Sequence, residues 1–364
     1  MSNILYFTRS MGVGGTENVV LQLCEIMGKD NKIIVCSCGG VNKERLVLMG
    51  IKHYDIPDIT EKSLLIACKI IKQLNFIISA EGIDTVHTHH RMAAFYIQCI
   101  RTFNKFNFIH TMHNTFYDKR LMTRFALFGA DLIAVGNKVK ENLCQEFSVS
   151  ESRITVIYNT VKPFNQTQNK VEVLEAAKKN SLFLVGNIGR LSKQKGMEFY
   201  IRSIPLVLNQ CKNIKFFIVG DGAEKQKLEG LINDLEIKEY VVMMGYRDDI
   251  QNIMGQLDLI VLSSLWEGFP LTPIEAFSVG KTVVATAVDG TTEIVEDFFN
   301  GLLTKAADEK DLADKIIKMV NDDEFRHSCE LHAQESYLTR FSYTHLKEQY
   351  INFYQSHQPY IRSL

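Results

Sequence analysis

At 364 residues the chain is too long for one ordinary hydrophobic core, so its length predicts two domains. With 46% hydrophobic and 23% charged residues, the composition is that of a globular protein. No apolar run approaches the roughly 18 residues of a membrane-spanning helix, and the net charge of −1 argues against a nucleic-acid-binding protein.

The small net charge hides an asymmetry between the two halves of the sequence. Residues 1–180 contain 22 Lys and Arg against 16 Asp and Glu, a net charge of +6. Residues 181–364 contain 19 against 26, a net charge of −7. A basic half suits an anionic lipid surface or a phosphate-bearing acceptor, and it equally suits a solvated surface with no partner.

The cysteines and the first residues indicate a cytoplasmic protein. The eight Cys form no CxxC pair and several lie in apolar runs, which is typical of reduced, buried thiols. Residues 3–7 predict a short strand rather than a secretory signal peptide. We therefore expect a cytoplasmic chain, with peripheral binding to the inner face of the cytoplasmic membrane as a further expectation.

Strands alternate with helices through the first half of the sequence, which predicts a mostly parallel sheet with right-handed crossovers. The expected strands are short apolar runs at residues 4–7, 32–38, 51–56, 85–87, 107–111 and 132–135. The expected helices are amphipathic segments between them, at residues 17–27, 62–80, 92–103 and 119–127.

The alternation pauses between Pro163 and Asn180, which separates a first domain (1–165) from a second (181–342) by a linker at 166–180. Strands are expected again at 182–188, 216–219, 240–244, 259–262 and 283–286. Helices follow at 308–321, 323–337 and 343–354, the last of them after a capping Ser342. Both halves are thus expected to be doubly wound α/β domains.

The segment 258–275, DLIVLSSLWEGFPLTPIE, has the character of a binding site. A buried strand ends at Leu262, a polar loop follows, and Pro273 suits the first turn of a helix. Glu267 in the loop and Glu275 on the helix are eight residues apart. Ligands of open α/β sheets bind where strands end and helices begin, so this segment predicts a nucleotide-sugar site.

The segment EGFPLTPIE resembles the signature of the family-four retaining glycosyltransferases, which have the GT-B fold. Further pieces match in the same order, namely GVGGTE (12–17), HTMHN (110–114), GRLSKQKG (189–196), VGDG (219–222) and DGTTEIV (289–295). The resemblance covers about residues 3–305 and implies two Rossmann-like domains that face a cleft. It also implies that a final helix at 343–364 packs back onto the first, acceptor-binding domain.

Two motifs offer groups for a diphosphate. Arg190 and Lys195 follow a strand in GRLSKQKG, where two fixed cations suit a leaving diphosphate, although a solvated basic loop has the same composition. Gly14 and Gly15 open a helix without completing GxGxxG, and no acid ends the second strand, which argues against a nicotinamide dehydrogenase. The resemblance places both glycines near the donor diphosphate and the acceptor.

The two carboxylates of the signature suit the carbohydrate part of the donor. Glu275 is expected to reach the ribose hydroxyls and Glu267 the transferred sugar, and the resemblance implies the same roles; a helix cap is the structural alternative for each Glu. The resemblance further implies that the backbone of Phe269, Pro270, Leu271 and Thr272 binds the phosphates or the sugar. Its N–H groups would donate at every position except Pro270, which has none. Glu293 in DGTTEIV is expected to approach the same site.

Five histidines lie at the ends of two expected strands: His87, His89, His90, His110 and His113. No HExxH spacing is present, so we expect no metal site. The resemblance assigns His113 to the donor sugar at the reacting centre. His89 and His90, with Asn114, suit the acceptor side, and core or surface histidines remain an equal alternative.

Residues 91–128 combine cations with aromatic side chains, which is typical of a helix on an anionic membrane and also of an aromatic core below a solvated face. Six Lys and Arg oppose the single acid Asp118, among the aromatic residues Phe95, Tyr96, Phe103, Phe106, Phe116, Tyr117, Phe125 and Phe128. A peripheral membrane contact through this segment is therefore one of our expectations.

These inferences predict a metal-independent hexosyltransferase with no cofactor. We expect it to move a hexose or N-acetylhexosamine from a nucleotide sugar, UDP-linked by preference, to a saccharide hydroxyl with retention of configuration. The expected acceptor is linked to polyprenyl diphosphate, as in the assembly of capsule, O-antigen or lipopolysaccharide. Two alternatives remain open: a nucleotide-sugar epimerase of similar shape, and a non-catalytic nucleotide-sugar-binding partner of another transferase.

Overall fold

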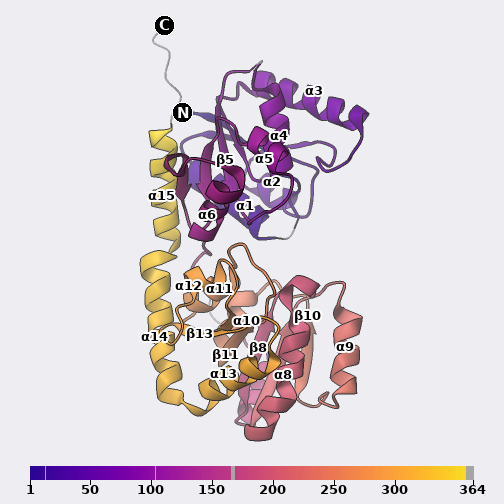
Figure 1. The fold of residues 1–364 in the computed structure, drawn as a ribbon, viewed down its shortest axis with the longest axis vertical. Helices are drawn as coiled ribbons and strands as arrows, with labels where there is room; N and C mark the ends of the chain where they lie inside the picture. Colours follow the sequence, from indigo (N-terminus) through magenta and orange to yellow (C-terminus); the bar gives the residue numbers. More distant parts are fainter. Residues whose placement is uncertain (13, 103, 165–168, 358–364) are drawn as a thin grey trace. The chain divides into compact units, whose positions relative to one another are not determined.

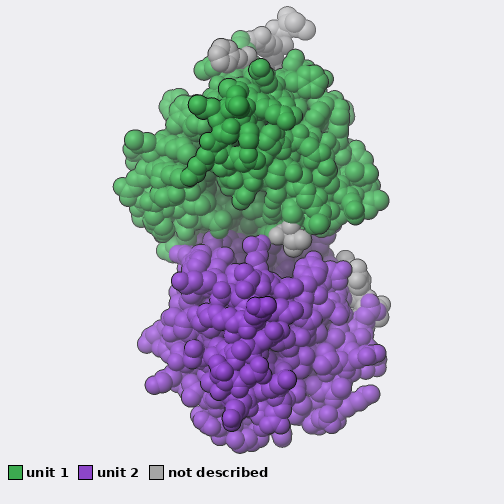
Figure 2. Space-filling view, turned by 90° about the vertical axis from the view of Figure 1, so that its right-hand side faces the viewer, with its two compact units in different colours: residues 1–159, 346–364 green, residues 160–345 purple. Residues whose placement is uncertain are grey.

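The computed structural model describes residues 1–12, 14–102, 104–164 and 169–357. The chain divides into two compact units (Figures 1 and 2). Unit 1 consists of residues 1–159 and 346–364, and unit 2 of residues 160–345. Each unit has its own sheet and its own hydrophobic core.

The described part of unit 1 holds a seven-stranded sheet in the order β3-β2-β1-β4-β5-β6-β7, with every neighbouring pair parallel. Its strands are β1 (Asn3–Phe7), β2 (Lys32–Ser37), β3 (Lys52–Asp55), β4 (Thr85–Thr88), β5 (Asn107–Met112), β6 (Asp131–Ala134) and β7 (Ile154–Val156). The order reverses between β1 and β4, the kind of switch point at which open α/β sheets bind ligands.

Seven α-helices of the described residues belong wholly or mostly to unit 1 (Figure 1). They are α1 (Gly15–Met27), α2 (Lys43–Leu48), α3 (Leu64–Glu81), α4 (Arg91–Ile100), α5 (Arg120–Ala126), α6 (Asn137–Phe147) and α15 (Tyr343–Ser356), with a short 3-10 turn η1 (Glu151–Arg153). Helices α3 to α6 pack against one another in series. Neither α2 nor α6 was expected, because α2 buries only Leu46 and α6 is polar apart from a sparse buried stripe.

Helix α15 joins the core of unit 1 from the far end of the chain. Leu346, Tyr350, Phe353 and Tyr354 are buried, and the amide of Asn107 on β5 donates to the carbonyl oxygen of His357 at 2.8 Å. The hydroxyl of Ser342 accepts from the backbone N–H of His345 at 3.2 Å, the cap expected from the sequence. Of the final helix expected over 343–364, residues 358–364 lie outside the described residues.

The described part of unit 2 holds a six-stranded parallel sheet in the order β10-β9-β8-β11-β12-β13. Its strands are β8 (Phe183–Ile188), β9 (Ile214–Val219), β10 (Val241–Gly245), β11 (Leu259–Leu262), β12 (Val283–Thr286) and β13 (Gly301–Thr304). Strand β11 is buried along its whole length, as its unbroken apolar run predicts. It lies beside β8, so the loops that follow these two strands meet at one edge of the sheet.

The helices of unit 2 cover this sheet and bury a continuous apolar core. They are α7 (Glu172–Lys179), α8 (Met197–Gln210), α9 (Lys225–Asp234), α10 (Ile250–Gln256), α11 (Thr272–Ser278), α12 (Thr291–Ile294), α13 (Glu309–Asn321) and α14 (Asp323–Arg340), with a 3-10 turn η2 (Lys193–Lys195). Helix α7 falls within the segment 166–180 expected as a linker. It forms because Leu174 and Ala177 give it a buried stripe against the unit; residues 166–168 lie outside the described residues.

Candidate active site

Hydrogen bonds of buried hydroxyl groups hold the start of the loop after β11. The amide of Asn187 on β8 donates to the hydroxyl oxygen of Ser263 at 2.9 Å, and Ser263 donates to the carbonyl oxygen of Lys195 at 3.0 Å. The hydroxyl of Thr286 on β12 donates to the carbonyl oxygen of Ser264 at 2.6 Å. Three neighbouring strands therefore hold the start of the loop that carries Glu267.

Lys195 and Glu267 form a short ion pair in this loop region. Lys195 Nζ lies 2.5 Å from Glu267 Oε1, and the two side chains are 21% and 7% exposed. The hydroxyl of Ser264 donates to the same oxygen at 2.7 Å, and the amide of Gln194 lies 3.5 Å from the other carboxylate oxygen. A carboxylate with this many donors is held in one orientation.

The backbones that carry this pair approach each other closely. Gly196 has a φ of +55°, and a Cβ placed on it would lie 2.2 Å from the carbonyl oxygen of Ser263. The N–H of Leu265 also donates to the carbonyl oxygen of Gln194 at 2.7 Å. Only glycine can adopt this backbone conformation and leave room for the Ser263 carbonyl oxygen. Gly196 therefore lets the turn η2, which carries Lys195, pack against the loop that carries Glu267.

Glu275 lies in the first turn of α11, whose second residue is Pro273. Desolvation raises the pKa of its carboxyl group to about 7, although the positive charge of Lys195 acts in the opposite direction. The positive charge of Lys195 thus offsets only part of the effect of desolvation on this carboxyl group. A perturbed carboxyl group beside a charged pair is typical of functional sites.

The other residues expected on the donor side lie at the same edge of unit 2. Arg190 is exposed in the loop after β8, and Glu293 is half-buried on α12. Of the four residues that lead into α11, Phe269 and Pro270 are buried, and Leu271 and Thr272 are half-buried. The structure joins Lys195 directly to Glu267, and it places Arg190 in the loop after β8 and Glu293 on α12.

Sequence reasoning missed the polar residues that orient Glu267, namely Ser264 and Gln194. Both stand inside the motifs that were recognised, since Ser264 follows β11 and Gln194 precedes Lys195. A pair of serines directly after a buried strand was the available indication, because buried hydroxyls need partners.

In unit 1, the carboxyl ends of β4 and β5 bring five histidines together. Because Thr88 pairs with His110 across the two strands, His89 and His113 follow at the same edge, with His89 Nδ1 3.1 Å from His113 Nε2. His110 Nδ1 lies 2.7 Å from the Thr88 hydroxyl. His90 caps α4 by accepting from the N–H of Met92.

These imidazole rings are neutral. Desolvation lowers the pKa of His113 to about 3, with a smaller contribution from His90, and that of His90 itself to about 4. Burial likewise lowers the pKa of His110 to about 3 and holds that of His89 well below its usual range. Histidines of this kind act as hydrogen-bonding groups rather than as cations at neutral pH.

A cavity of about 200 Å³ opens beside this histidine cluster. His89, His90, His113 and Asn114 line it, together with Glu17 at the start of α1. The structure thus brings the three residues expected on the acceptor side to one cavity, and it adds His113 to them. Asn114 is exposed, and the lining also includes residues 8–10 after β1 together with Thr111, Met112 and Phe116.

Gly14 and Gly15 of GVGGTE stand at the start of α1, beside this cavity. Gly14 is the residue before the helix, and a Cβ on it would lie 2.5 Å from the carboxylate of Glu17. The Glu17 carboxylate also accepts from the hydroxyl of Ser10 at 2.9 Å. The missing side chain of Gly14 therefore leaves room for the Glu17 carboxylate at the start of α1.

Comparison with known protein families matches both units. A model described as "Glycosyltransferase Family 4" matches residues 13–163, and one described as "Glycosyl transferases group 1" matches residues 167–336. The chain belongs to the group 1 glycosyltransferases. The family resemblance inferred from EGFPLTPIE is confirmed, and so is the predicted enzyme class, a hexosyltransferase.

Relatives of this glycosyltransferase span most of its length. A UDP-Gal:alpha-D-GlcNAc-diphosphoundecaprenol alpha-1,3-galactosyltransferase of Escherichia coli is 27% identical over 341 residues, which cover 85% of this chain and 86% of that protein. An uncharacterized glycosyltransferase of Methanocaldococcus jannaschii is 29% identical over 342 residues, which cover 79% and 82%. The relatives also include a capsular polysaccharide biosynthesis glycosyltransferase of Staphylococcus aureus, 26% identical over 61% of this chain and 60% of that protein.

Solved structures show the fold of the glycosyltransferase. HepE of Anabaena, crystallised in complex with UDP, superposes with a TM-score of 0.84 over 98% of this chain and 100% of its own, at 22% identity. The lipopolysaccharide glycosyltransferase WaaG superposes with a TM-score of 0.75 over 96% and 99%, at 15% identity. The predicted GT-B class, two doubly wound parallel sheets, is confirmed by these matches and by the two observed sheets.

The segment 91–128 of the glycosyltransferase is only in part an exposed basic and aromatic surface. Tyr96 is buried, and the Arg91 guanidinium stacks on the Phe116 ring at 3.6 Å and pairs with Asp118 at 2.9 Å, so these residues are structural. Phe103 lies outside the described residues. The region around α5 does form an exposed apolar and aromatic surface, which consists of Tyr117, Leu121, Phe125 and Phe128.

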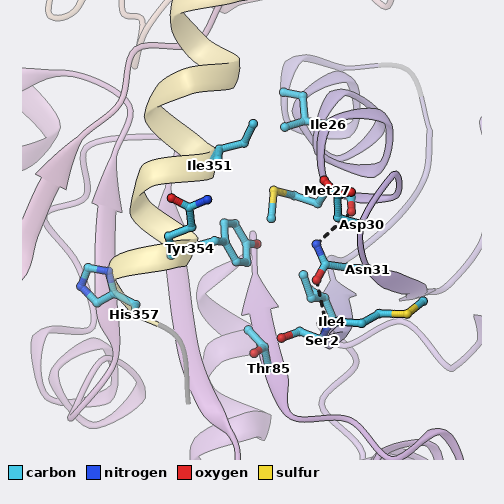
Figure 3. A pocket seen from close by; sticks show the side chains of 12 residues that line it. Ser2, Ile4, Ile26, Met27, Asp30, Asn31, Thr85, Ile351, Tyr354 and His357 are labelled. Atoms are coloured by element: carbon cyan, nitrogen blue, oxygen red, sulfur yellow. Dashed lines mark hydrogen bonds between the residues drawn. The ribbon is translucent and has the colours of Figure 1, made fainter. Parts of the chain in front are cut away.

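A second pocket of unit 1 lies at the amino ends of β1 and β4 (Figure 3). Tyr354 projects into it from α15. The side chain of Asn31 accepts a hydrogen bond from the N–H of Ser2 at 2.9 Å and donates one to the carbonyl oxygen of Met27 at 3.0 Å. This pocket contains none of the residues expected at the active site. The strand ends that carry the histidines are at the other edge of the sheet.

The described residues hold neither a metal cluster nor a spanning helix. No group of three or more His, Cys, Asp or Glu side chains within them is arranged to hold a metal ion. None of their helices is long and apolar enough to cross a membrane.

Proposed function

We propose that this glycosyltransferase moves a hexose or an N-acetylhexosamine from a UDP-sugar to a hydroxyl group of a saccharide linked to polyprenyl diphosphate. The bond forms with retention of anomeric configuration, during assembly of a bacterial surface polysaccharide such as capsule, O-antigen or lipopolysaccharide. The observation that carries this proposal is the ion pair of half-buried Lys195 with buried Glu267 at the sheet edge of unit 2, beside the desolvated Glu275.

Unit 2 supplies the donor site in this proposal. Lys195 and Arg190 bind the diphosphate, one as a point charge and the other as a planar fork. The backbone N–H groups of Phe269, Leu271 and Thr272 lie beside them, while Pro270 has none to donate. The carboxyl group of Glu275 accepts hydrogen bonds from the ribose hydroxyls, and that of Glu267 accepts one from a hydroxyl of the transferred sugar. Glu293 lies on the adjacent α12 and borders the same site. HepE was crystallised in complex with UDP, which supports a uridine nucleotide for this chain.

The chemical step follows from this distribution of charge. The bond between the anomeric carbon and the diphosphate oxygen breaks, and negative charge builds on the departing UDP, where Lys195 and Arg190 stabilise it. The acceptor hydroxyl attacks on the same face, and its proton passes to an oxygen of the departing diphosphate. No divalent metal is required, since the two cations neutralise the charge that a metal would otherwise balance.

Unit 1 supplies the acceptor side. His89, His90 and Asn114 line its cavity, and Gly14 and Gly15 border it, so neutral imidazoles, an amide and backbone groups are available to saccharide hydroxyls. His113 contacts the transferred sugar. The Escherichia coli relative is named for a diphosphoundecaprenol-linked saccharide, which supports a lipid-linked acceptor for this chain.

The exposed face at α5 suits a peripheral contact with the inner, anionic surface of the cytoplasmic membrane. Leu121 and Phe128 are 81% and 71% exposed, and Arg120 and Arg124 stand beside them on the same helix region. Exposed apolar and aromatic side chains with flanking cations bind at the interface of an anionic bilayer. Such a contact would keep the enzyme beside a lipid-linked acceptor.

The proposal is tested by incubating the purified full chain with a panel of UDP-sugars and synthetic polyprenyl-diphosphate saccharides. Mass spectrometry should find a product heavier by one hexose or N-acetylhexosamine, and NMR should show the anomeric configuration of the donor in the new bond. An inverted product would refute the retaining mechanism. Interconversion of the donor sugar without a new bond would instead identify an epimerase, and UDP binding without transfer or hydrolysis would identify a non-catalytic partner.

A further inference from the structure

His89 and His113 share one hydrogen bond, and this bond determines where the proton of His113 resides. Nδ1 of His89 lies 3.1 Å from Nε2 of His113, with ring centroids 5.4 Å apart. Both rings are neutral, so one nitrogen of this contact must bear a hydrogen and the other must present a lone pair. Two arrangements are open from the distance alone, because either ring can be the donor.

The surroundings of His89 decide between these arrangements. His89 is 3% exposed, and its second nitrogen, Nε2, is buried without a hydrogen-bond partner among the described residues. If the proton were on Nε2, a buried N–H donor would be left unsatisfied, whereas a proton on Nδ1 leaves only a lone pair. Unsatisfied buried N–H groups are the rarer case in folded proteins. Nδ1 of His89 therefore donates, and Nε2 of His113 accepts.

The ring of His89 cannot turn freely out of this arrangement. It stacks on His87 with centroids 4.3 Å apart and an interplanar angle of 29°. His87 is itself held at both nitrogens, by the hydroxyl of Tyr354 at 2.6 Å and by that of Thr111 at 2.7 Å. Tyr354 belongs to α15, so a residue from the end of the chain fixes the platform on which His89 rests.

We propose that His89 is a positioning residue that holds His113 in the tautomer with its proton on Nδ1. His113 then offers an N–H donor to an oxygen atom of the sugar that undergoes transfer. It is not a general base, because its lone pair at Nε2 is occupied by His89. This inference rests on the proposed function, and it adds the direction of the hydrogen bond that His113 makes to its ligand.

The direct test reads the tautomer without any substrate. Two-dimensional ¹H–¹⁵N spectra of the histidine side chains of the labelled full chain distinguish a protonated Nδ1 from a protonated Nε2, and His113→Gln assigns the signal by its loss. The expected result is a neutral His113 protonated at Nδ1. A neutral His113 protonated at Nε2 in the wild-type chain would overturn the proposal.

Variants of His89 test the positioning role. His89→Asn places an amide N–H close to the position of Nδ1, so it should keep the tautomer of His113 and a sugar-transfer rate well above that of His89→Leu. His89→Leu removes the donor, and kcat should fall on the order of 100-fold, as expected when a reacting group is misplaced, with the KM for the donor changed far less. Equal transfer rates for the Asn and Leu variants would overturn the proposal.

The spectra separate this inference from the proposed function. If the wild-type chain transferred no sugar from any donor, the proposed function would fail while the tautomer was still measured. If His113 changed tautomer in His89→Leu and the transfer rate stayed constant, the positioning role would be refuted although the enzyme acted as proposed. Thermal unfolding of both variants checks that the stacked histidines remain folded.

Discussion

Lys195 Nζ and Glu267 Oε1 lie 2.5 Å apart at the end of two neighbouring strands of unit 2. The proposed diphosphate ligand would share Lys195 with this carboxylate. In the ligand-free chain the Glu267 carboxylate therefore keeps the ammonium group in place, with Ser264 and Gln194 as its further donors. Preorganised charge of this kind costs no rearrangement when negative charge develops on the leaving group.

Replacing Lys195 by Met should separate the catalytic role of the pair from its structural role. Sugar transfer should fall by about 100- to 1,000-fold, the usual effect of losing one preorganised charge-stabilising group. The free energy of unfolding should fall by about 1–3 kcal/mol, because Glu267 is left as a buried carboxylate with weaker partners. Initial rates and urea denaturation measure the two effects.

The double variant Lys195→Met, Glu267→Gln is the informative comparison. It removes the uncompensated charge, so it should recover most of the lost stability and none of the lost activity. Lys193→Met in the same turn is the matched control, because Lys193 is exposed, and it should change neither quantity. If activity returned together with stability in the double variant, Lys195 would be a structural residue only.

Glu275→Gln should stabilise the ligand-free protein above neutral pH. Burial raises the pKa of this carboxyl group from 4.5 in the ordinary case to about 7. The folded protein thus keeps a proton that the unfolded chain loses between these values, and wild-type stability falls as the pH rises through that range. Gln carries no charge, so the gain should be absent near pH 4 and reach about 1–3 kcal/mol at pH 8.

Urea denaturation at both pH values checks this prediction. The change Glu229→Gln, on an exposed position of α9, is the control and should leave the pH dependence of the unfolding free energy as in the wild type. A Glu275→Gln variant that was less stable than the wild type at pH 8 would show that the carboxylate is compensated in the folded state.

Gly290→Ala should disturb the donor site without changing a single polar group. A Cβ at position 290 would lie 2.0 Å from the carbonyl oxygen of Gly268 and 3.0 Å from Cα of Phe269, so the loop before α11 must move. We expect weaker UDP binding by thermal shift and a loss of about 1–3 kcal/mol of stability. Gly230→Ala on α9 meets no atom within 4 Å and should instead stabilise the chain by about 0.5–1 kcal/mol. Unchanged UDP binding in Gly290→Ala would argue against a role of this loop.

Polar substitutions on the exposed face at α5 should weaken binding to anionic vesicles. The double variant Leu121→Ser, Phe128→Ser removes the two most exposed apolar side chains of this helix region, so it should sediment with phosphatidylglycerol vesicles several-fold less than the wild type. Leu331→Ser on α14 of unit 2, another exposed leucine, is the control. Equal sedimentation of the wild type with neutral and anionic vesicles would contradict the proposed contact.

The sequence predicted most strands of the two sheets, because strands such as Leu259–Leu262 are unbroken apolar runs. It did not predict the short edge strands β7 and β13. It did not predict α6 or α7, whose few buried residues become a stripe only against a neighbouring layer. Local periodicity in a polar segment is too weak for such elements.

The candidate site was predictable as a set of residues and not as a set of contacts. The motifs identified Lys195, Glu267 and Glu275, but the closeness of Lys195 to Glu267 depends on Gly196 lying against Ser263, which no local pattern records. The bond between His89 and His113 likewise depends on the pairing of β4 with β5. Long-range register determines both contacts.

The central claim is that unit 2 binds the nucleotide of a UDP-sugar through Arg190, Lys195 and Glu275. Calorimetric titration of UDP in the presence of EDTA tests it most directly. We expect one UDP per chain, with affinity reduced about 10- to 100-fold in Glu275→Ala, as expected for a hydrogen bond to a charged or buried carboxyl group, and unchanged in Glu229→Ala. Binding that needed a divalent metal, or that was equally strong in wild type and Glu275→Ala, would contradict it.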